Sequence, residues 1–240
     1  ILHGQVGYQT VEKDARGQLM KVHDNTDPVP GQDIMLHLDS QLQKAVEKAF
    51  GDHRGAVIAL DPNTGGVLAL VSKPAFDPNL FVQGISRAEF AKLNDPLTTP
   101  MFNRALAKYA PGSTLKPFLA LAALNYGLRT KEQTVSDPGY YRLKNEEHIY
   151  HDWTWWVNES GHNQVDMQKA IFQSCDIYFY DLAVDMGIDK MHDFLFRFGF
   201  GRNTTVDLPQ ASSGTLPSRQ WKRETLGESW YPGDTLNSSL

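Results

Sequence analysis

The chain has 240 residues, 41% of them hydrophobic, so it can bury one substantial core with or without a smaller appendage. A formal net charge of −5 without any long basic run excludes the electrostatic footprint of a nucleic-acid-binding protein. No apolar run approaches the roughly 18 to 20 residues that a membrane-spanning helix needs. The single cysteine, Cys175, excludes an internal disulfide and leaves the cellular compartment open.

The first 31 residues are polar and rich in glycine, with short alternating stretches, which predicts a small β appendage. The sequence Pro28-Val29-Pro30-Gly31 punctuates its end, so a second domain is expected over residues 32–240. That domain opens with an apolar run over residues 34–38, which predicts a strand. A helix over residues 42–50 follows, with Asp39 or Ser40 as its cap and with Ser40 and Gln43 spaced as a capping box.

Two apolar runs, residues 56–60 and 66–71, enclose the turn-favouring sequence of residues 61–65 and predict an antiparallel β-hairpin. Helical periodicity begins at Ser113 and continues to Gly127. Further helices are expected over residues 166–172, 176–186 and 189–198, with Gly187 and Gly199 at the positions of C-terminal caps. Strands followed by helices indicate the α+β class, with an antiparallel sheet and a mostly helical part.

Ser113 and Lys116 form the only Ser-x-x-Lys sequence in the chain, directly after Pro111-Gly112. At a helix start, Ser113 would lie near unpaired backbone amides and the positive end of the helix dipole, which stabilise an oxyanion. Lys116 lies one turn further on the same face, where a desolvated amine can act as base toward the hydroxyl. The alternative is an ordinary helix start with a solvated lysine, since such a pattern arises by chance about once in a chain of this length.

A second polar group, Ser174-Cys175-Asp176, falls at the junction of two predicted helices. Its neighbours Ile171, Phe172, Ile177 and Phe179 are apolar, so the polar side chains need partners. Ser174 could relay a proton and Asp176 could hold Lys116 by its charge. The alternative is that Ser174 or Asp176 only caps a helix.

Cys175 also suggests a metal site, because the preceding segment offers Asp137, Asp152 and His162, with His148 and His151 nearby. One thiolate, one imidazole and carboxylates can complete a tetrahedral zinc site. A buried thiol with loop-capping aspartates is the alternative. The same segment contains Trp153, Trp155 and Trp156, which could line a groove or pack the loop onto the core.

The two motifs resemble the first two of the penicillin-binding proteins, whose set is Ser-x-x-Lys, Ser-Asp-Asn and Lys-Thr-Gly. Asp176, where Asn is commoner, is similar to the penicillin-binding protein 2 group, the monofunctional class B transpeptidases of rod-shape elongation. The resemblance extends over nearly the whole chain, because further stretches are also similar to that group: residues 2–8, 61–70, 76–81 and 230–235.

This resemblance implies that Ser113 attacks the penultimate D-Ala of a peptidoglycan stem peptide and is the target of β-lactams. Lys116 would be the base for acylation, Ser174 a proton relay and Asp176 an orienting charge, with no cofactor for catalysis. The resemblance also implies a structural zinc on Asp137, Asp152, His162 and Cys175. It further implies a SEDS-class glycosyltransferase and rod-complex proteins as partners. The location implied is the periplasmic side of the bacterial inner membrane, with an N-terminal helical anchor outside this chain.

One departure from the family pattern is that neither Lys-Thr-Gly nor Lys-Ser-Gly occurs; Thr64-Gly65 follows Asn63 instead. In the family that motif lies on a later strand, so residues 32–240 are expected to be the N-terminal part of a transpeptidase domain, without its C-terminal strands. Residues 1–31 would be a remnant of a non-catalytic pedestal. The chain alone is then expected to be inactive. A serine β-lactamase and a catalytically silent β-lactam-binding or scaffold module remain the alternatives.

Overall fold

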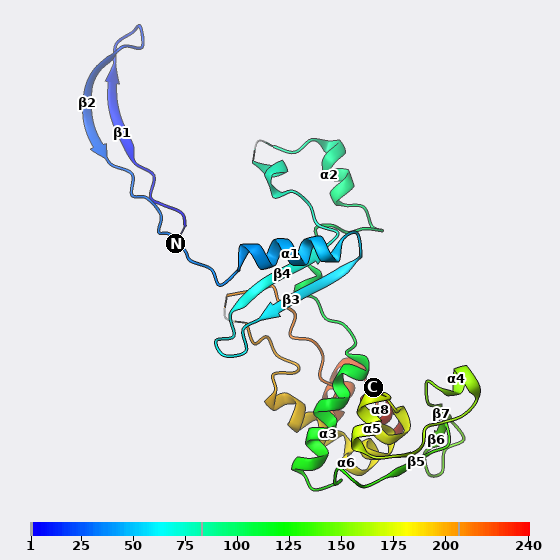
Figure 1. Ribbon diagram of the computed structural model, residues 1–240. Coiled ribbons are helices and arrows are strands. Elements are labelled where there is room, and N and C mark those ends of the chain that lie inside the picture. Colours follow the sequence, from blue (N-terminus) through cyan, green and yellow to red (C-terminus); the bar gives the residue numbers. More distant parts are fainter. Residues whose placement is uncertain (1, 83, 206) are drawn as a thin grey trace. The chain divides into compact units, whose positions relative to one another are not determined.

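The computed structural model of the protein describes residues 2–82, 84–205 and 207–240 and divides into two compact units, Ile1–Ala105 and Leu106–Leu240 (Figure 1). The strands are β1 Tyr8–Lys13, β2 Leu19–Thr26, β3 Gly55–Leu60, β4 Val67–Lys73, β5 Val135–Asp137, β6 Tyr140–Arg142, β7 Ile149–His151 and β8 Asn163–Val165. The α-helices are α1 Ser40–Phe50, α2 Arg87–Leu93, α3 Lys116–Asn125, α4 Trp155–Asn158, α5 Met167–Phe172, α6 Asp176–Arg197, α7 Arg219–Leu226 and α8 Pro232–Asn237. Three short 3₁₀ helices are η1 Pro78–Phe81, η2 Arg104–Leu106 and η3 Gly112–Leu115.

The strands pair as antiparallel hairpins and ribbons, β1 with β2, β3 with β4, β5 with β8 and β6 with β7. Together with the helices they confirm the α+β class. Among the described residues, no helix combines the length and the apolar character that crossing a membrane requires.

The first unit contains the predicted hairpin of β3 and β4, and the predicted β appendage, which is also a hairpin. The polar N-terminal segment forms β1 and β2, and the second hairpin pairs Gly55 with Lys73 through to Leu60 with Val67. Between β3 and β4, the Asp61 carboxylate accepts hydrogen bonds from the backbone of Asn63 (2.9 Å) and the hydroxyl of Thr64 (2.8 Å). Side chain to backbone bonding of this kind is why such residues favour a tight turn.

Helix α1 lies along the β3–β4 hairpin (Figure 1), and its Gln43 fixes that position. The Gln43 amide donates to the carbonyl of Leu70 (3.1 Å) and accepts from its backbone N–H (2.9 Å). These two bonds satisfy backbone groups of β4 on the side that faces away from β3.

Two local predictions for this unit are wrong. Residues 34–38 form no strand in the described part of the chain, and Met35 is 97% exposed, because the run has no partner strand to accept its backbone hydrogen bonds. The capping box on Ser40 is also wrong, since Asp39 caps α1 and Ser40 is its first helical residue. Gln43 is bonded to β4 instead. The expected domain boundary near Gly31 stays a prediction.

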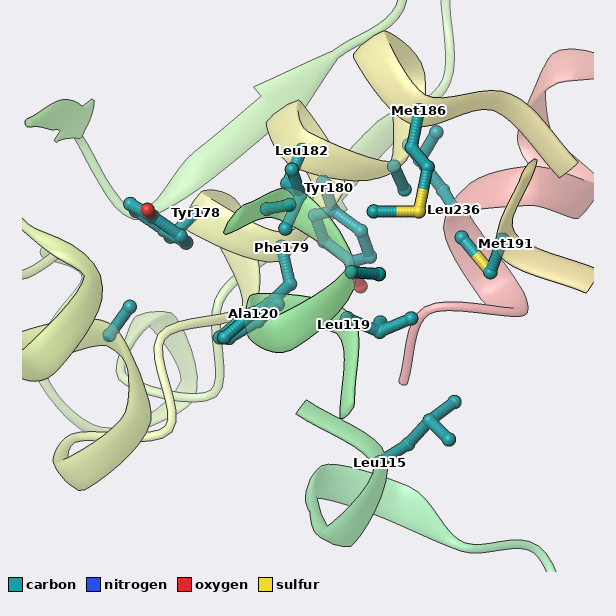
Figure 2. Packing of buried hydrophobic residues seen from close by; sticks show 14 of the residues in the cluster. Leu115, Leu119, Ala120, Tyr178, Phe179, Tyr180, Leu182, Met186, Met191 and Leu236 are labelled. Atoms are coloured by element: carbon teal, nitrogen blue, oxygen red, sulfur yellow. The ribbon is translucent and has the colours of Figure 1, made fainter. Parts of the chain in front are cut away.

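The second unit is built around α3 and α6, whose apolar faces meet in one buried cluster (Figure 2). Leu119 and Ala123 of α3 and Phe179 and Leu182 of α6 are at most 1% exposed. Leu236 of α8 completes the cluster. Because burial of such side chains stabilises each by roughly 1.5 to 3 kcal/mol, this cluster fixes the position of both helix starts.

Helix α6 joins the two helices that were predicted over residues 176–186 and 189–198. Gly187, with φ +71° and ψ 158°, has a non-helical conformation and places a kink where the sequence predicted a cap. The helix ends at Arg197, and Gly199 follows with φ +91°, as expected for a residue just past a helix end. Helix α5 begins one residue later than predicted, with Asp166 as its cap.

Candidate active site

Ser113 is exposed and lies in η3, directly before α3. The backbone N–H of Lys116 donates to the carbonyl of Ser113, which closes a 3₁₀ turn. Pro117 has no N–H and cannot make the α-helical bond to the same carbonyl. The sequence therefore explains why the chain turns tightly here and presents the hydroxyl of Ser113 above the start of α3.

Lys116 is almost fully buried, with 1% of its surface exposed. Its ammonium donates to the carbonyl of Ser174 (2.8 Å), to the hydroxyl of Ser174 (3.2 Å) and to Oδ1 of Asp176 (2.5 Å). A buried ammonium is tolerated only when its three N–H groups and its charge have partners. All three partners come from the two residues that flank Cys175.

Ser174 connects Lys116 to Ser113. Its Oγ accepts from Lys116 and donates to Oγ of Ser113 at 2.6 Å. The sequence spacing predicted that Lys116 would reach Ser113 directly, but the structure places the hydroxyl of Ser174 between them. The result is a continuous chain of hydrogen bonds from the exposed hydroxyl of Ser113 to the buried pair of Lys116 and Asp176.

Asp176 lies at the start of α6, with 15% of its side chain exposed. Burial raises the pKa of the Asp176 carboxyl above its ordinary value, and the hydrogen bond and charge of Lys116 oppose that rise. Its Oδ2 accepts from the backbone N–H of Trp153 (3.2 Å), which leaves Oδ1 directed at Lys116.

The N-terminal cap of α6 is Cys175, whose Sγ accepts from the backbone of Tyr178 (3.4 Å). The alternative interpretation of the second motif was that Ser174 or Asp176 caps a helix, but neither of them is the cap of α6. Of the four apolar neighbours expected to surround that motif, Ile177 and Phe179 are buried, but Ile171 and Phe172 are exposed. The latter two lie on α5, on the face turned away from the core.

Cys175 itself belongs to a second cluster of polar side chains. Asp137, Asp152, His162 and Cys175 each offer one ligand atom, and these four atoms lie within 4.8 Å of one another. Nδ1 of His162 is 2.8 Å from Oδ2 of Asp137, and Sγ of Cys175 is 3.2 Å from the same oxygen. Two carboxylates, one imidazole and one thiol match the donor set of a tetrahedral zinc site.

The electrostatics of this cluster are those of a buried acidic site. Burial acts to raise the pKa of Asp137, but the backbone N–H groups of His162 and Gly139 donate to its carboxylate and hold the pKa below its ordinary value. Burial raises the pKa of the Cys175 thiol. His148 and His151 are not in the cluster: His151 stacks on Trp155 (4.8 Å between ring centroids), and His148 lies edge-on to Tyr150 (4.6 Å).

Trp153 is a contact that the sequence did not predict as part of the site. Besides its backbone bond to Asp176, its indole Nε1 donates to the carbonyl of Gln173 (3.1 Å). The sequence marked Trp153 only as one of several aromatic residues. Its position directly after Asp152 was the available signal, because a candidate metal ligand close to the second motif also places the next residue close to it.

The fold and the first two motifs define a class of protein. The family described as "Penicillin binding protein transpeptidase domain" matches residues 55–237, so the chain belongs to the penicillin-binding protein transpeptidase family.

The relatives narrow the likeness to one group. The chain is 44% identical to peptidoglycan D,D-transpeptidase MrdA of Acinetobacter baumannii, over 100% of this chain and 35% of that protein. It is 44% identical to MrdA of Escherichia coli K12, over 98% of this chain and 37% of that protein. The chain thus spans little more than a third of the length of these two relatives.

Solved structures give the same result. A Pseudomonas aeruginosa PBP2 in complex with WCK 5153 has a TM-score of 0.84 and 49% identity, covering 89% of this chain and 46% of that one. A Helicobacter pylori PBP2 in complex with MreC has a TM-score of 0.85 and 33% identity, covering 98% of this chain and 43% of that one. The resemblance to the penicillin-binding protein 2 group is confirmed, and with it the penicillin-binding fold.

Proposed function

We propose that the protein containing this chain is a peptidoglycan D,D-transpeptidase that cross-links stem peptides through an acyl-enzyme on Ser113. The observation that carries the proposal is the hydrogen-bond chain from Ser113 through Ser174 to Lys116 and Asp176. It joins an exposed nucleophile to a buried amine through one hydroxyl, which is the arrangement that serine activation by lysine requires.

The reaction has two acyl transfers. Ser113 Oγ bonds to the carbonyl carbon of the penultimate D-Ala, the peptide C–N bond breaks, and the terminal D-Ala leaves with a proton. An amine of a second stem peptide then bonds to the same carbon and gives up one proton, the ester bond to Ser113 breaks, and Ser113 Oγ recovers a proton. When Lys116 is neutral, the two hydrogen bonds run opposite to those in the structure, so Ser113 donates to Ser174 and Ser174 donates to Lys116. The proton of Ser113 then passes to Ser174 while the proton of Ser174 passes to Lys116. Asp176 holds the resulting ammonium, and the side chains that carry these steps need no cofactor.

The same site accounts for β-lactams as inhibitors, since a β-lactam carbonyl would acylate Ser113 in place of the D-Ala carbonyl. The relatives support the wider setting. One similar structure is a PBP2 with MreC, and another is a peptidoglycan synthase complex. We place the protein at the periplasmic side of the inner membrane, with a SEDS-class glycosyltransferase and rod-complex proteins as its partners.

Residues 1–240 taken alone are expected not to acylate. The sequence contains no Lys-Thr-Gly or Lys-Ser-Gly, and in this family that motif lines the cleft and supplies the second donor for the oxyanion. Covalent labelling of isolated residues 1–240 by a fluorescent penicillin would contradict this expectation.

A structural zinc is the second part of the proposal. Asp137, Asp152, His162 and Cys175 would hold it, and the metal would tie strands β5 and β8 and the end of β7 to the start of α6. When bound, it supplies the positive charge that the two buried carboxylates need, and it has no step in the acyl transfer. Elemental analysis of the purified full-length protein is expected to find one zinc per chain, and a metal-free protein with an unchanged fold would disprove this part.

The experiment that tests the main proposal is covalent labelling of the full-length protein with a fluorescent penicillin. Wild type is expected to form a stable adduct on Ser113, and Ser113→Ala is expected to form none. Following the adduct after removal of free penicillin separates the alternatives, because rapid loss indicates a β-lactamase. Ser113→Ala that still supports cell growth as the only copy would favour a silent scaffold.

A further inference from the structure

Ser174, at the junction of α5 and α6, has a backbone conformation that other groups must hold in place. Ser174 has φ +55°, in the left-handed region that a non-glycine residue rarely adopts. That conformation costs roughly 1 to 2 kcal/mol and persists only when the surroundings fix the backbone. In this conformation the Ser174 hydroxyl donates to Oγ of Ser113, 2.6 Å away.

The peptide groups on both sides of Ser174 are held by side chains. The carbonyl of Ser174 accepts from the ammonium of Lys116 (2.8 Å), and the carbonyl of Gln173 accepts from the indole N–H of Trp153 (3.1 Å). Gln173 is the C-cap of α5, so its carbonyl is one of the groups that a helix end leaves without an internal partner. Trp153 supplies that partner from a separate segment of the chain.

The Trp153 segment is itself fixed to the second motif. The backbone N–H of Asp176 donates to Oδ2 of Asp152 (2.8 Å), and the backbone N–H of Trp153 donates to Oδ2 of Asp176 (3.2 Å). This reciprocal pair places residue 153 beside the start of α6, from which its indole reaches back to residue 173. The indole ring also lies over His162, with 5.8 Å between ring centroids.

We propose that Trp153 is a positioning residue for acylation: its indole N–H fixes the Gln173 carbonyl, and thereby keeps Ser174 in the conformation that directs its hydroxyl at Ser113. This inference rests on the proposed function, because it assigns to Trp153 the alignment of the relay from Ser113 to Lys116. Trp153 acts through Ser174 and takes no part in bond making.

The test uses Trp153→Phe in the full-length protein, a change that keeps an aromatic ring and removes the N–H. Its matched control is Trp156→Phe, three residues further along, where the indole is 77% exposed. The limiting rate of acylation by a fluorescent penicillin and the dissociation constant of the complex that precedes it are measured separately. Trp153→Phe is expected to lower the limiting rate about three- to tenfold, the effect of one lost hydrogen bond, with the dissociation constant unchanged. Trp156→Phe is expected to match wild type.

A double-mutant cycle with Ser174→Ala sharpens the assignment. Without the Ser174 hydroxyl there is nothing for Trp153 to align, so Trp153→Phe is expected to have little further effect on the residual rate. The same factor in both backgrounds would overturn the proposal. So would an unchanged limiting rate in Trp153→Phe, or a loss of zinc in Trp153→Phe alone. If Ser174→Ala reacts too slowly to measure, the separated rate and binding constants decide.

The labelling results distinguish the proposed function from the role of Trp153. A wild-type protein that never acylates at Ser113 would contradict the proposed function. A wild type that acylates normally, together with a Trp153→Phe variant indistinguishable from Trp156→Phe, would contradict only the role of Trp153.

Discussion

Two buried polar clusters meet at Cys175 and its neighbours, and they balance their charges differently. In the proposed catalytic cluster, Asp176 is paired with the ammonium of Lys116 at 2.5 Å. In the second cluster, Asp137 and Asp152 are 2% and 0% exposed, and their partners are N–H groups, a hydroxyl, an imidazole and a thiol. One cluster contains its own cation, whereas the other presents the donor set that a metal cation requires.

Because of this difference, the start of α6 can contribute both to proton transfer and to holding chain segments together. A lysine within the chain can give up and regain a proton, so its cluster can move protons during catalysis. A zinc ion has a fixed charge and a fixed geometry, so its cluster can only hold segments together. The two clusters share the peptide groups between residues 174 and 176, so substitutions in one cluster test whether the other is independent of it.

The largest effect is expected from removing the internal cation. Lys116→Met keeps much of the apolar stem but leaves Asp176 without its charge partner and Ser174 without its proton acceptor. Acylation by a fluorescent penicillin should fall by about 100- to 10,000-fold, the usual contribution of a positioned general base. Zinc content, measured on the same sample, should not change. A variant that loses zinc together with acylation would mean that the clusters are not independent.

The second-largest effect is expected from removing one ligand of the proposed zinc site. Cys175→Ser replaces the thiol with a poorer zinc ligand, and the melting temperature of the full-length protein should fall by about 5 °C or more, as lost metal binding becomes lost folding free energy. Calorimetry with and without a chelator measures it, and the chelator should have little further effect on the variant. His148→Ala is the control, since His148 lies outside the set. An unchanged melting temperature and unchanged metal content in Cys175→Ser would refute the site.

The smallest effect is expected from Asp176→Asn. The amide is nearly the same size, can still accept from Lys116, and is the residue more common at this position in the wider family. It removes only the negative charge opposite the ammonium, so we expect the acylation rate to fall by about tenfold. The rate constant for labelling gives the answer, and a loss as large as that of Lys116→Met would show that the charge of Asp176, rather than the amine, limits the reaction.

Local features of the fold were predictable because their causes are local. The sequence Asp61 to Gly65 forms the turn between β3 and β4 through bonds within those five residues. Pro117 and Gly112 bracket the tight turn at Ser113 for equally local reasons. The two wrong predictions were also based on local patterns, but their outcome depended on distant residues. Residues 34–38 had strand propensity without a strand to pair with. Gln43 bonds to Leu70 of β4 instead of forming a capping box.

For the site, residue identity and part of the connection were predictable, since the sequence indicated that Asp176 would hold Lys116 and the structure pairs these two residues. The spacing of Ser113 and Lys116 and the unusual Ser174-Cys175-Asp176 group named the participants, and Cys175 with three upstream residues named a metal set. The spacing suggested a direct contact from Lys116 to Ser113, yet the hydroxyl of Ser174 bonds to both of them. The signal for Trp153 was only its position directly after Asp152.

The sequence by itself determined the family and predicted Ser113 as nucleophile, Lys116 as its base, and the helix and turn boundaries near them, since short-range sterics and hydrogen bonds depend on neighbouring residues alone. Only the tertiary structure decided that the segments around residues 113, 137, 153, 162 and 174 converge at the start of α6. That convergence depends on the packing of α3 against α6, which buries Lys116, and a buried ammonium needs a charge partner such as Asp176. The burial of Lys116, rather than the spacing of the motifs along the chain, therefore explains why these residues lie together.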